Sequence, residues 1–393
     1  MSITPETFLI AALSGRALSQ SARAASLPVT VLDVYGDADT CAAAAASARV
    51  GDAQLQISRH RLLEAAERLC PPHRCTGLVY GAGFESDSQT LTDLAAGREL
   101  LGNDPAMLRD ISSPRYFFSL LDRLGIPHPP VTYRRPADSP GWLAKRPGSC
   151  GGGHVMPAHR VTDTSGHYYQ RKLPGRVMSV LFLANGRRMA VVGISEQWSD
   201  TTGSPESYRY GGAVSGQNIG SALRHEVMHA ITTLVSRLCL RGLNSVDIVV
   251  DKNEFYVLEV NGRPTATTEL YDHGGPDSLF RQHLACCRGD KPSFHDRTGP
   301  GRAHAIVYAV REINVAADVR WPGWCSDIPV PGSTILPGGP VCTVHATGNH
   351  LPRVRGVLER RSRMVRELLP AVPAREYLTR HLATAGQARP CHP

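Results

Sequence analysis

The sequence predicts a mixed α/β protein composed of several domains. Three observations support this fold class. Apolar segments at 7–13 and 29–35 flank a run of helix-forming residues, as in a small α/β unit. A strand-rich stretch follows between 141 and 261, and 302–345 is typical of a short-stranded terminal domain. With 393 residues, the chain also exceeds the roughly 100 to 200 residues of one ordinary domain.

The N-terminal segment predicts strand, helix and strand over 7–13, 17–25 and 29–35, followed by a parallel strand within "TGLVYGAGFE" at 76–85. The stretch after the first strand reads "SGRALS" and contains no G-x-G-x-x-G pattern. Binding of a dinucleotide is therefore not supported.

A helix is expected over "SSPRYFFSLLDRLG", beginning after two serines of the capping type and ending at Gly125, before the proline cluster "IPHPP". The segments 141–155 and 168–198 then predict strands, joined by a glycine-rich loop and an Asn-Gly turn. Apolar residues at helical spacing over 222–241 predict a second long helix, with Gly242 as its C-cap glycine.

The hairpin "SVDIVVDKNEFYVLEVN" places polar side chains at the end of an apolar strand. Regular alternation puts Phe255, Val257, Glu259 and Asn261 on one face. Asp247 precedes Glu259 by 12 residues, so a loop of odd length, such as Lys252–Glu254, would set the two carboxylates opposite one another. A loop of two or four residues would turn Asp247 away. Facing carboxylates favour Mg²⁺, whereas the alternative is a polar, exposed strand end.

Lys145 ends an apolar strand segment, and "PGSCGGG" follows it within eight residues. The unencumbered backbone N–H groups of such a loop can surround phosphate oxygens, although a glycine-rich loop by itself is more often a flexible turn. Together with the hairpin, these residues supply a cation, a set of donors and a metal site, which are the parts that phosphate chemistry needs.

The order of these features resembles the ATP-grasp superfamily over residues 1 to about 345. The resemblance rests on the motifs "LLGND", "FFSLLDRLGIPHPP", "WLAKRPGSCGGG", "YYQRKLPG", "LRGLNSVDIVV" and "FYVLEVNGRPT". The chain is also similar to predicted ATP-dependent carboligases related to biotin carboxylase and associated with methanopterin-type one-carbon cofactor biosynthesis. Its segment "PGGPVCTVHATG" looks like the C-terminal part of that group.

The resemblance implies an ATP-grasp fold in three parts. Residues 1–104 would form a Rossmann-like N-terminal domain. Residues 105–290 would form the ATP-binding core, with lobes of about 105–172 and 173–290. Residues 291–393 would form a small β-rich domain with a terminal helix.

The resemblance also assigns site residues. Lys145 and Arg263 would be catalytic, stabilising phosphoryl charge. The expected metal ligands are Asp247, Glu259 and Asn261. The expected ATP contacts are Arg115, Lys145, Ser149, Gly151, Gly152, Gly153 and the adenine linker with Gln170, Arg171 and Leu173. Two positions depart from the usual pattern: Arg115 replaces a lysine, and Gln170 replaces an acidic residue.

The implied reaction is ATP-dependent ligation of a carboxylate and an amine through an acyl-phosphate, forming an amide, ADP and phosphate with Mg²⁺ or Mn²⁺ as cofactor. Its pathway would be tetrahydromethanopterin-type or methanofuran-type cofactor biosynthesis. The alternatives are carboxylation as in biotin carboxylase and a nucleotide-binding regulator without catalysis. Cys150 in the glycine-rich loop is interpreted as a tolerated small residue. Two interpretations stay open for Glu196 and for Tyr210 with its "YGG" turn: they line the acceptor site, or they belong to a surface loop.

Composition favours a soluble, cytoplasmic protein. Hydrophobic residues make up 42% and charged residues 20%, no run of 18 apolar residues occurs, and the first residues lack a basic signal-peptide region. The ten cysteines are scattered, so reduced thiols are expected, and Cys70 and Cys75 have poor spacing for zinc. We expect small-molecule substrates and neither nucleic acid nor a membrane as partner. A homodimer is one candidate for the oligomeric state. The net charge of +8 fits anionic substrates, and "RVRGVLERRSRMVRE" predicts a solvated helix face.

Overall fold

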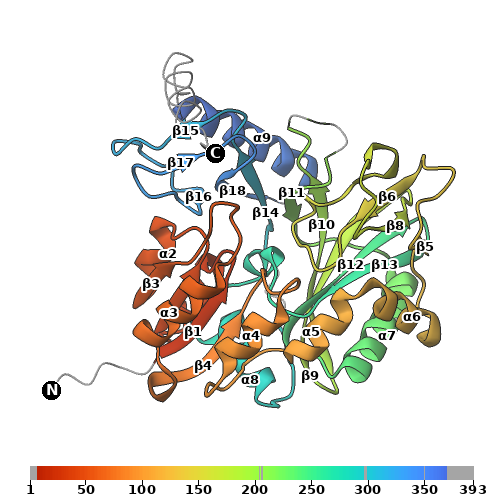
Figure 1. The fold of residues 1–393 in the computed structure, drawn as a ribbon, viewed down its shortest axis with the longest axis horizontal. Helices are drawn as coiled ribbons and strands as arrows, with labels where there is room; N and C mark the ends of the chain where they lie inside the picture. The colour runs from red at the N-terminus through yellow and green to blue at the C-terminus, as the bar shows by residue number, and fades with distance from the viewer. Residues whose placement is uncertain (1–6, 203, 205–206, 296–298, 349, 370–393) are drawn as a thin grey trace, which may run out of the picture.

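The computed structural model describes residues 7–202, 204, 207–295, 299–348 and 350–369. Figure 1 shows the N-terminal unit on one side, a large central sheet, and a smaller sheet formed by β5, β6 and β8 on the other side. The C-terminal helix α9 lies across the end of the central sheet that is formed by β14 and β18. The expected mixed α/β fold class is confirmed.

The N-terminal unit is a parallel sheet with the strand order β3-β2-β1-β4. The strands β1 and β2 are almost entirely buried, as expected for a parallel sheet covered on both faces. This confirms the predicted strand, helix, strand and later parallel strand. The strands are β1 (Thr7–Ala12), β2 (Val29–Asp33), β3 (Ala46–Arg49) and β4 (Cys75–Tyr80), and the helices are α1 (Arg16–Ala24), α2 (Ala38–Ala43), α3 (Arg59–Leu69) and α4 (Ser88–Ala95).

Two helices connect this unit to a small antiparallel sheet with the order β5-β8-β6-β7. The predicted helix before "IPHPP" is confirmed, and Gly125 ends it in the left-handed conformation with a φ of 64°. These elements are α5 (Pro105–Ser112), α6 (Pro114–Leu124), β5 (Val131–Thr132), β6 (Trp142–Lys145), β7 (Met156–Pro157) and β8 (Tyr168–Arg171).

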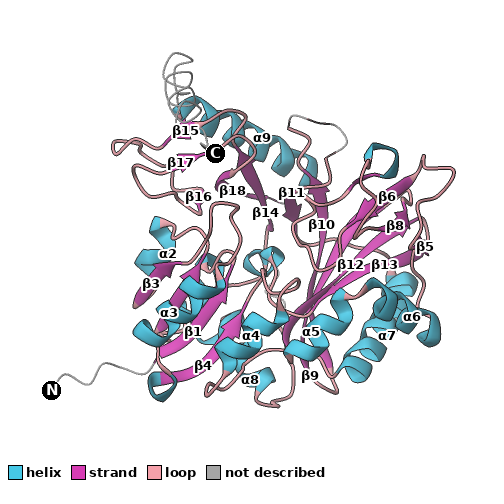
Figure 2. Ribbon diagram, viewed as in Figure 1, coloured by secondary structure: helices cyan, strands magenta, loops and turns pink. Residues whose placement is uncertain are grey.

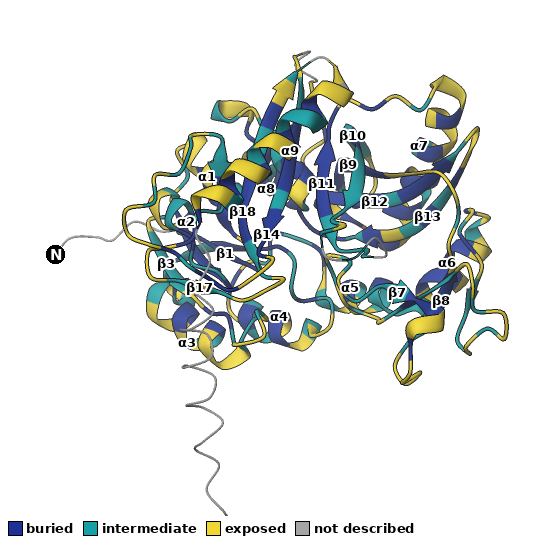
Figure 3. Cartoon of the chain, turned by 90° about the horizontal axis from the view of Figure 1, so that it is seen from above, coloured by how far each residue is buried: buried dark blue, intermediate teal, exposed yellow. Residues whose placement is uncertain are grey.

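The central sheet has the order β13-β12-β9-β10-β11-β14-β18-β16 (Figure 2). Its buried strands appear as the dark interior in Figure 3. The predicted Asn-Gly turn joins β9 and β10. The strands are β9 (Arg176–Asn185), β10 (Met189–Ser199), β11 (Tyr210–Val214), β12 (Arg241–Asp251), β13 (Glu254–Asn261), β14 (Gly301–Tyr308), β16 (Cys325–Ser326) and β18 (Pro340–Gly348).

The remaining elements are short, apart from two long helices. These are α7 (Ser221–Leu238), α8 (Leu279–Cys287), α9 (Leu351–Leu368), the paired strands β15 (Ile313–Asn314) and β17 (Thr334–Ile335), and the 3₁₀ turns η1 (Pro72–Arg74), η2 (Ala158–Arg160), η3 (Ala266–Leu270) and η4 (Gly275–Asp277). Among the described residues, no helix is both long and apolar enough to cross a membrane.

The predicted helix over 222–241 exists, but the assignment of Gly242 as its C-cap glycine is wrong. α7 ends at Leu238, and Cys239 adopts the left-handed conformation that closes it. Gly242 lies inside β12, where an added Cβ atom would lie 2.4 Å from His283 Nδ1. The glycine is required by this close approach to α8, a tertiary contact that has no signal in the local sequence.

The hairpin contains a second difference. Its loop has only two residues, because Asp251 pairs with Glu254, and this loop length was expected to turn Asp247 away. A β-bulge between Ile248 and Asp247 corrects the register, so Asp247 nevertheless pairs with Glu259. The bulge also reverses the alternation: Phe255, Val257 and Val260 share one buried cluster. The expected grouping of Phe255 and Val257 with Glu259 on one face is therefore wrong.

The C-terminal strands continue the central sheet, since β14 pairs with β11. They also have their own buried cluster, to which α9 contributes Val354, Leu358 and Val365. The arginine-rich segment is thus an amphipathic helix, as predicted, with Arg360 and Arg363 exposed. The division at 104, 172 and 290 stays a prediction.

Candidate active site

The two hairpin carboxylates lie side by side on neighbouring strands, Asp247 on β12 opposite Glu259 on β13. Gln197 Nε2 donates to Asp247 Oδ1 over 3.3 Å, and Asn261 Nδ2 donates to Asp247 Oδ2 over 3.3 Å. Burial, followed by the neighbouring Glu259 carboxylate, raises the pKa of Asp247 to about 7. The structure therefore brings the three expected metal ligands together, in an arrangement that disfavours a second negative charge.

Lys145, at the end of β6, faces these carboxylates from the smaller sheet. Burial lowers the pKa of Lys145, while Glu259 and Asp247 act in the opposite direction. The expected cation and the expected metal ligands thus meet between two sheets, although more than one hundred residues separate them in sequence.

The residues of the hairpin fit a hard divalent cation. Carboxylate and amide oxygens are the ligands of Mg²⁺, which commonly takes one or two carboxylates and completes its shell with phosphate and water. Within the described ranges, no cluster of three or more His, Cys, Asp or Glu side chains could hold a metal alone. Asn261 Oδ1 accepts from Arg263 over 3.0 Å, so Asn261 fits as a ligand only with its amide group turned over.

Arg263 is buried beside the hairpin end and is already engaged by protein groups. Its Nε donates to Glu85 Oε1, and Nη2 donates to Asn261. Glu85 in turn accepts from the backbone N–H of Gly83 over 2.8 Å. Arg263 therefore joins the end of the metal hairpin to the loop after β4 of the N-terminal unit.

The glycine-rich loop lies against two other segments. An added Cβ atom on Gly148 would be 2.8 Å from the carbonyl oxygen of Glu85, and one on Gly152 would be 2.0 Å from that of Tyr208. The backbone N–H of Tyr210 donates to the carbonyl of Gly151 over 2.9 Å. Only glycine permits these approaches. Ser149 and Gly153 are exposed, so the loop is partly packed against the protein and partly open to solvent.

Two further side chains of this loop are close to the charged groups. Burial, followed by Glu85, raises the pKa of the Cys150 thiol to about 12. His154 is half-buried, and burial lowers its pKa, while Glu259 acts in the opposite direction. Its Nδ1 has no hydrogen-bond partner among the described residues. Cys150 is therefore a neutral thiol, and His154 is a neutral ring with an open nitrogen.

The expected adenine linker leaves the smaller sheet at the end of β8. Gln170 is buried there, and its Nε2 has no partner among the residues described. The backbone N–H of Arg171 donates to the carbonyl of Pro130 over 2.9 Å. Leu173 is half-buried.

Arg115 lies apart from the groups around Lys145. It is exposed on α6, with its guanidinium 4.0 Å above the ring of Tyr133. No contact within the described part of the chain joins it to the hairpin.

Sequence reasoning missed several neighbours of the site, namely Glu85, His154 and Gln197. Glu85 had a signal, because it follows the carboxyl end of a parallel strand, where ligands of α/β sheets bind. Gln197 and His154 had none. Gln197 comes close only because β10 lies two strands from β12 in the central sheet, and His154 only because the glycine-rich loop packs near the hairpin.

Neither Glu196 nor Tyr210 belongs to a surface loop. Glu196 lies in β10, 2.7 Å from Arg355 of α9. Tyr210 begins β11, so the "YGG" segment forms a strand and not the expected turn. The Tyr210 hydroxyl lies 2.7 Å from His304 Nε2.

The comparisons with known proteins agree with this arrangement. Residues 115–267 match the family model described as the ATP-grasp domain. No curated protein matches the chain.

Among solved structures, an L-amino acid ligase from Bacillus licheniformis is 13% identical, with a TM-score of 0.67, covering 94% of this chain and 100% of that one. N5-carboxyaminoimidazole synthetase from Staphylococcus aureus is 13% identical, with a TM-score of 0.65 and coverage of 92% and 100%. A biotin carboxylase in complex with β,γ-ATP from Campylobacter jejuni is 12% identical, with a TM-score of 0.65 and coverage of 87% of both chains.

These similarities extend over nearly the whole chain and show its fold. The segment matched by the family model contains Lys145, the glycine-rich loop and the β12–β13 hairpin. The chain therefore has the ATP-grasp fold, and its residues 115–267 match the model of the ATP-grasp domain.

Proposed function

We propose that this protein is an ATP-dependent carboxylate-amine ligase that releases ADP and phosphate. One observation carries the proposal: Asp247 and Glu259 face each other close to Lys145, and the glycine-rich loop brings Cys150 and His154 close to Glu259. This arrangement combines two carboxylates for a metal, a partly buried cation and backbone donors, as transfer of a phosphoryl group requires.

In the proposed reaction, a carboxylate oxygen of the first substrate attacks the γ-phosphorus of ATP, and the bond to the leaving ADP oxygen breaks. The amine of the second substrate then attacks the acyl carbon, forming the C–N bond, while phosphate leaves with the bonding electrons and the amine loses a proton. Lys145 stabilises the transferred charge, and the glycine-rich loop excludes water. Bound Mg²⁺ or Mn²⁺, held by Asp247, Glu259 and Asn261, would neutralise phosphate charge.

Arg263 has a more specific part in this proposal. In the described structure its guanidinium is held by Glu85 and Asn261. It is positioned at the junction between the hairpin and the N-terminal unit, where an acyl-phosphate would form. Gln170, the carbonyl of Arg171 and the backbone of Leu173 would bind adenine, and Ser149, Gly151, Gly152 and Gly153 would contact phosphate. We assign Arg115 an outer electrostatic role.

The substrates are proposed as small molecules, and the location as the cytoplasm. A place in methanopterin-type or methanofuran-type cofactor biosynthesis rests on sequence resemblance alone. The likeness to biotin carboxylase favours a second candidate, ATP-dependent carboxylation, in which bicarbonate would replace the carboxylate substrate.

The experiment is ATP turnover by the pure protein with Mg²⁺ across a panel of carboxylates and amines, in buffer freed of bicarbonate. ADP and phosphate formed only with a carboxylate and amine pair, together with an amide detected by mass spectrometry, is the expected result. Turnover that requires added bicarbonate would replace ligation by carboxylation. AMP as product, or ATP binding without turnover under every condition, would overturn the proposal.

A further inference from the structure

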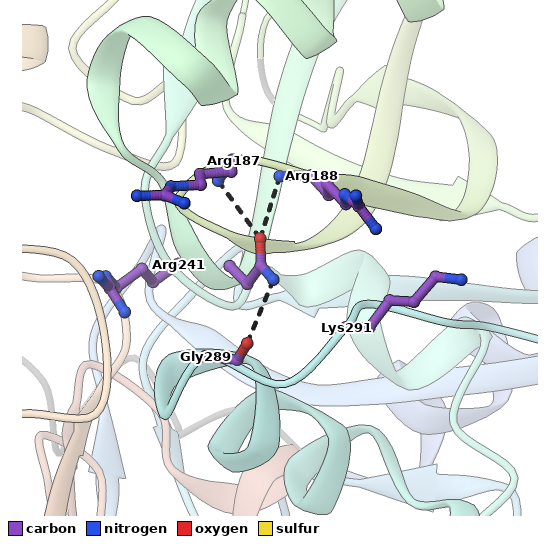
Figure 4. Close-up of a pocket in the computed structure, with 6 residues that line it drawn as sticks. Arg187, Arg188, Arg241, Gly289 and Lys291 are labelled. Carbon is purple, nitrogen blue, oxygen red and sulfur yellow. Dashed lines mark hydrogen bonds between the residues drawn. The ribbon is translucent and has the colours of Figure 1, made fainter.

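A second concave site lies away from the candidate active site. It is a pocket of about 500 Å³, within the range of small-molecule sites. Its lining residues are Asn185, Arg187, Arg188, Arg241, Gly289 and Lys291 (Figure 4). Four of these six residues are cationic, and none is acidic.

The pocket and the candidate active site occupy opposite ends of the same two strands. Arg241 pairs with Asn185 across β12 and β9, whereas Asp247 pairs with Ser179. Six residues separate these positions along each strand, a distance of about 20 Å at the rise of an extended chain. A small ligand in the pocket would therefore not reach the metal hairpin.

The backbone of the pocket is fixed by hydrogen bonds. Asn185 Oδ1 accepts from the backbone N–H groups of Arg187 and Arg188 over 3.3 and 3.0 Å. Its Nδ2 donates to the carbonyls of Gly289 and Asp290 over 3.3 and 3.1 Å. Asn185 thus ties the β9–β10 turn to the segment after α8, as Figure 4 shows for the contacts with Arg187, Arg188 and Gly289.

The four basic side chains, by contrast, lack charged partners. All four are exposed, and none forms an ion pair within the described ranges. Arg241 makes one hydrogen bond with its side chain, from Nη1 to the carbonyl of Cys287 over 3.2 Å. The nearby Arg288 shows the contrast, because it lies 2.7 Å from Glu99. The carboxylate of Asp290 does not line the pocket.

We propose that this pocket binds a small anion of the phosphate class that carries two or more negative charges, such as a pyrophosphate group. Four unpaired cations around one concavity raise the local positive potential, and guanidinium groups bind phosphate oxygens in pairs. The four cations gather around one concavity, which suits a compact ligand, whereas a nucleic acid would be bound along a stripe of basic residues. This site is separate from the proposed ligase chemistry.

The test is calorimetric titration of the full chain with inorganic pyrophosphate in buffer without Mg²⁺. The pocket variant is Arg187→Gln/Arg188→Gln. The matched control is Arg360→Gln/Arg363→Gln, which removes the same charge from exposed positions of α9. Lys145→Ala tests whether the probe binds at the nucleotide site instead. Circular dichroism melts of all variants establish that they fold.

We expect one pyrophosphate per chain, with the Kd raised at least about ten-fold by the pocket variant and changed less than about two-fold by the control and by Lys145→Ala. The affinity should fall as KCl is raised, because exposed charges are screened. No binding to the wild type, equal weakening by both double variants, or loss in Lys145→Ala would each overturn the proposal. A single-stranded oligonucleotide that binds more tightly than pyrophosphate and depends on Arg187 and Arg188 would also overturn it.

Discussion

Two groups of carboxylates differ in how their charge is balanced. Within the described part of the chain, neither Asp247 nor Glu259 forms an ion pair with an arginine, and burial together with Glu259 raises the pKa of Asp247 to about 7. Glu269 of η3 has Arg16 Nη1 at 2.5 Å, and its other oxygen lies 2.8 Å from His304 Nδ1. Burial would raise the pKa of Glu269, but Arg16 and His304 outweigh it and hold that pKa well below its usual value.

The comparison distinguishes a candidate metal site from a network of ion pairs that stabilises the fold. Arg16 also pairs with Asp327 through Nε at 3.0 Å, so the second group connects the N-terminal helix α1, the turn η3 and the C-terminal strands. Its charges are neutralised by the protein itself. The first group is incomplete without a cation, which is the property expected of a metal site.

The largest effect is expected from Asp247→Asn. If the first group holds the metal, turnover should fall by at least about 100-fold, because a neutral amide neither balances nor holds the ion as well. The measurement is ADP release with Mg²⁺ and the carboxylate and amine pair that the turnover panel identifies. Glu254→Gln is the control, an exposed residue at the start of the partner strand β13, and should retain activity. Equal loss in both variants would contradict the metal assignment.

The next prediction concerns the free energy of unfolding. Here the substitution in the second group should be the more damaging one. Glu269→Gln leaves Arg16 with one carboxylate fewer in a buried place, and should lower the free energy of unfolding by about 3 kcal/mol. Asp247→Asn in EDTA should raise it by on the order of 1 kcal/mol, because an unfavourable buried charge is removed. Urea denaturation measures both.

Glu99→Gln, which breaks the exposed pair with Arg288, should cost less than about 1 kcal/mol. If Asp247→Asn proved as destabilising as Glu269→Gln, the two groups would not differ in the way inferred here.

A smaller effect is the pH dependence of the second group. The folded-state pKa of Glu269 is depressed, so its contribution is present above the unfolded value of about 4.3 and is lost as the pH falls through the folded value. The stability difference between wild type and Glu269→Gln should therefore be constant from pH 7 to pH 5 and shrink at more acidic pH. A difference that grows on acidification would have the wrong sign.

The smallest effect is expected from Cys150→Ser. With its pKa raised to about 12, the thiol is protonated at neutral pH and is a poor nucleophile. ATP turnover should change by less than about two-fold, and the wild-type thiol should react slowly with iodoacetamide compared with the exposed Cys41. Loss of activity in the serine variant would give Cys150 a role in the chemistry.

Much of the fold could be predicted from local patterns. The buried apolar strands β1 and β2, the helix ending at Gly125 and the strands around Lys145 follow from hydrophobic periodicity and glycine positions. The pairing of Asp247 with Glu259 was predicted through the wrong loop length. The bulge that produces it depends on packing of Val257 and Val260 against the core, which the loop sequence does not reveal.

The sequence by itself determined the residue types of the candidate site: a lysine at a strand end, a glycine-rich loop, and Asp247, Glu259 and Asn261 on one hairpin. These are local patterns, because each element encodes its own periodicity and turns. Only the tertiary structure decided that Glu85 holds Arg263, that Gly148 and Gly152 touch distant backbone, and that four basic residues surround one pocket. The reason is physical: these contacts join segments far apart in the chain, and their geometry is set by how the sheets pack together.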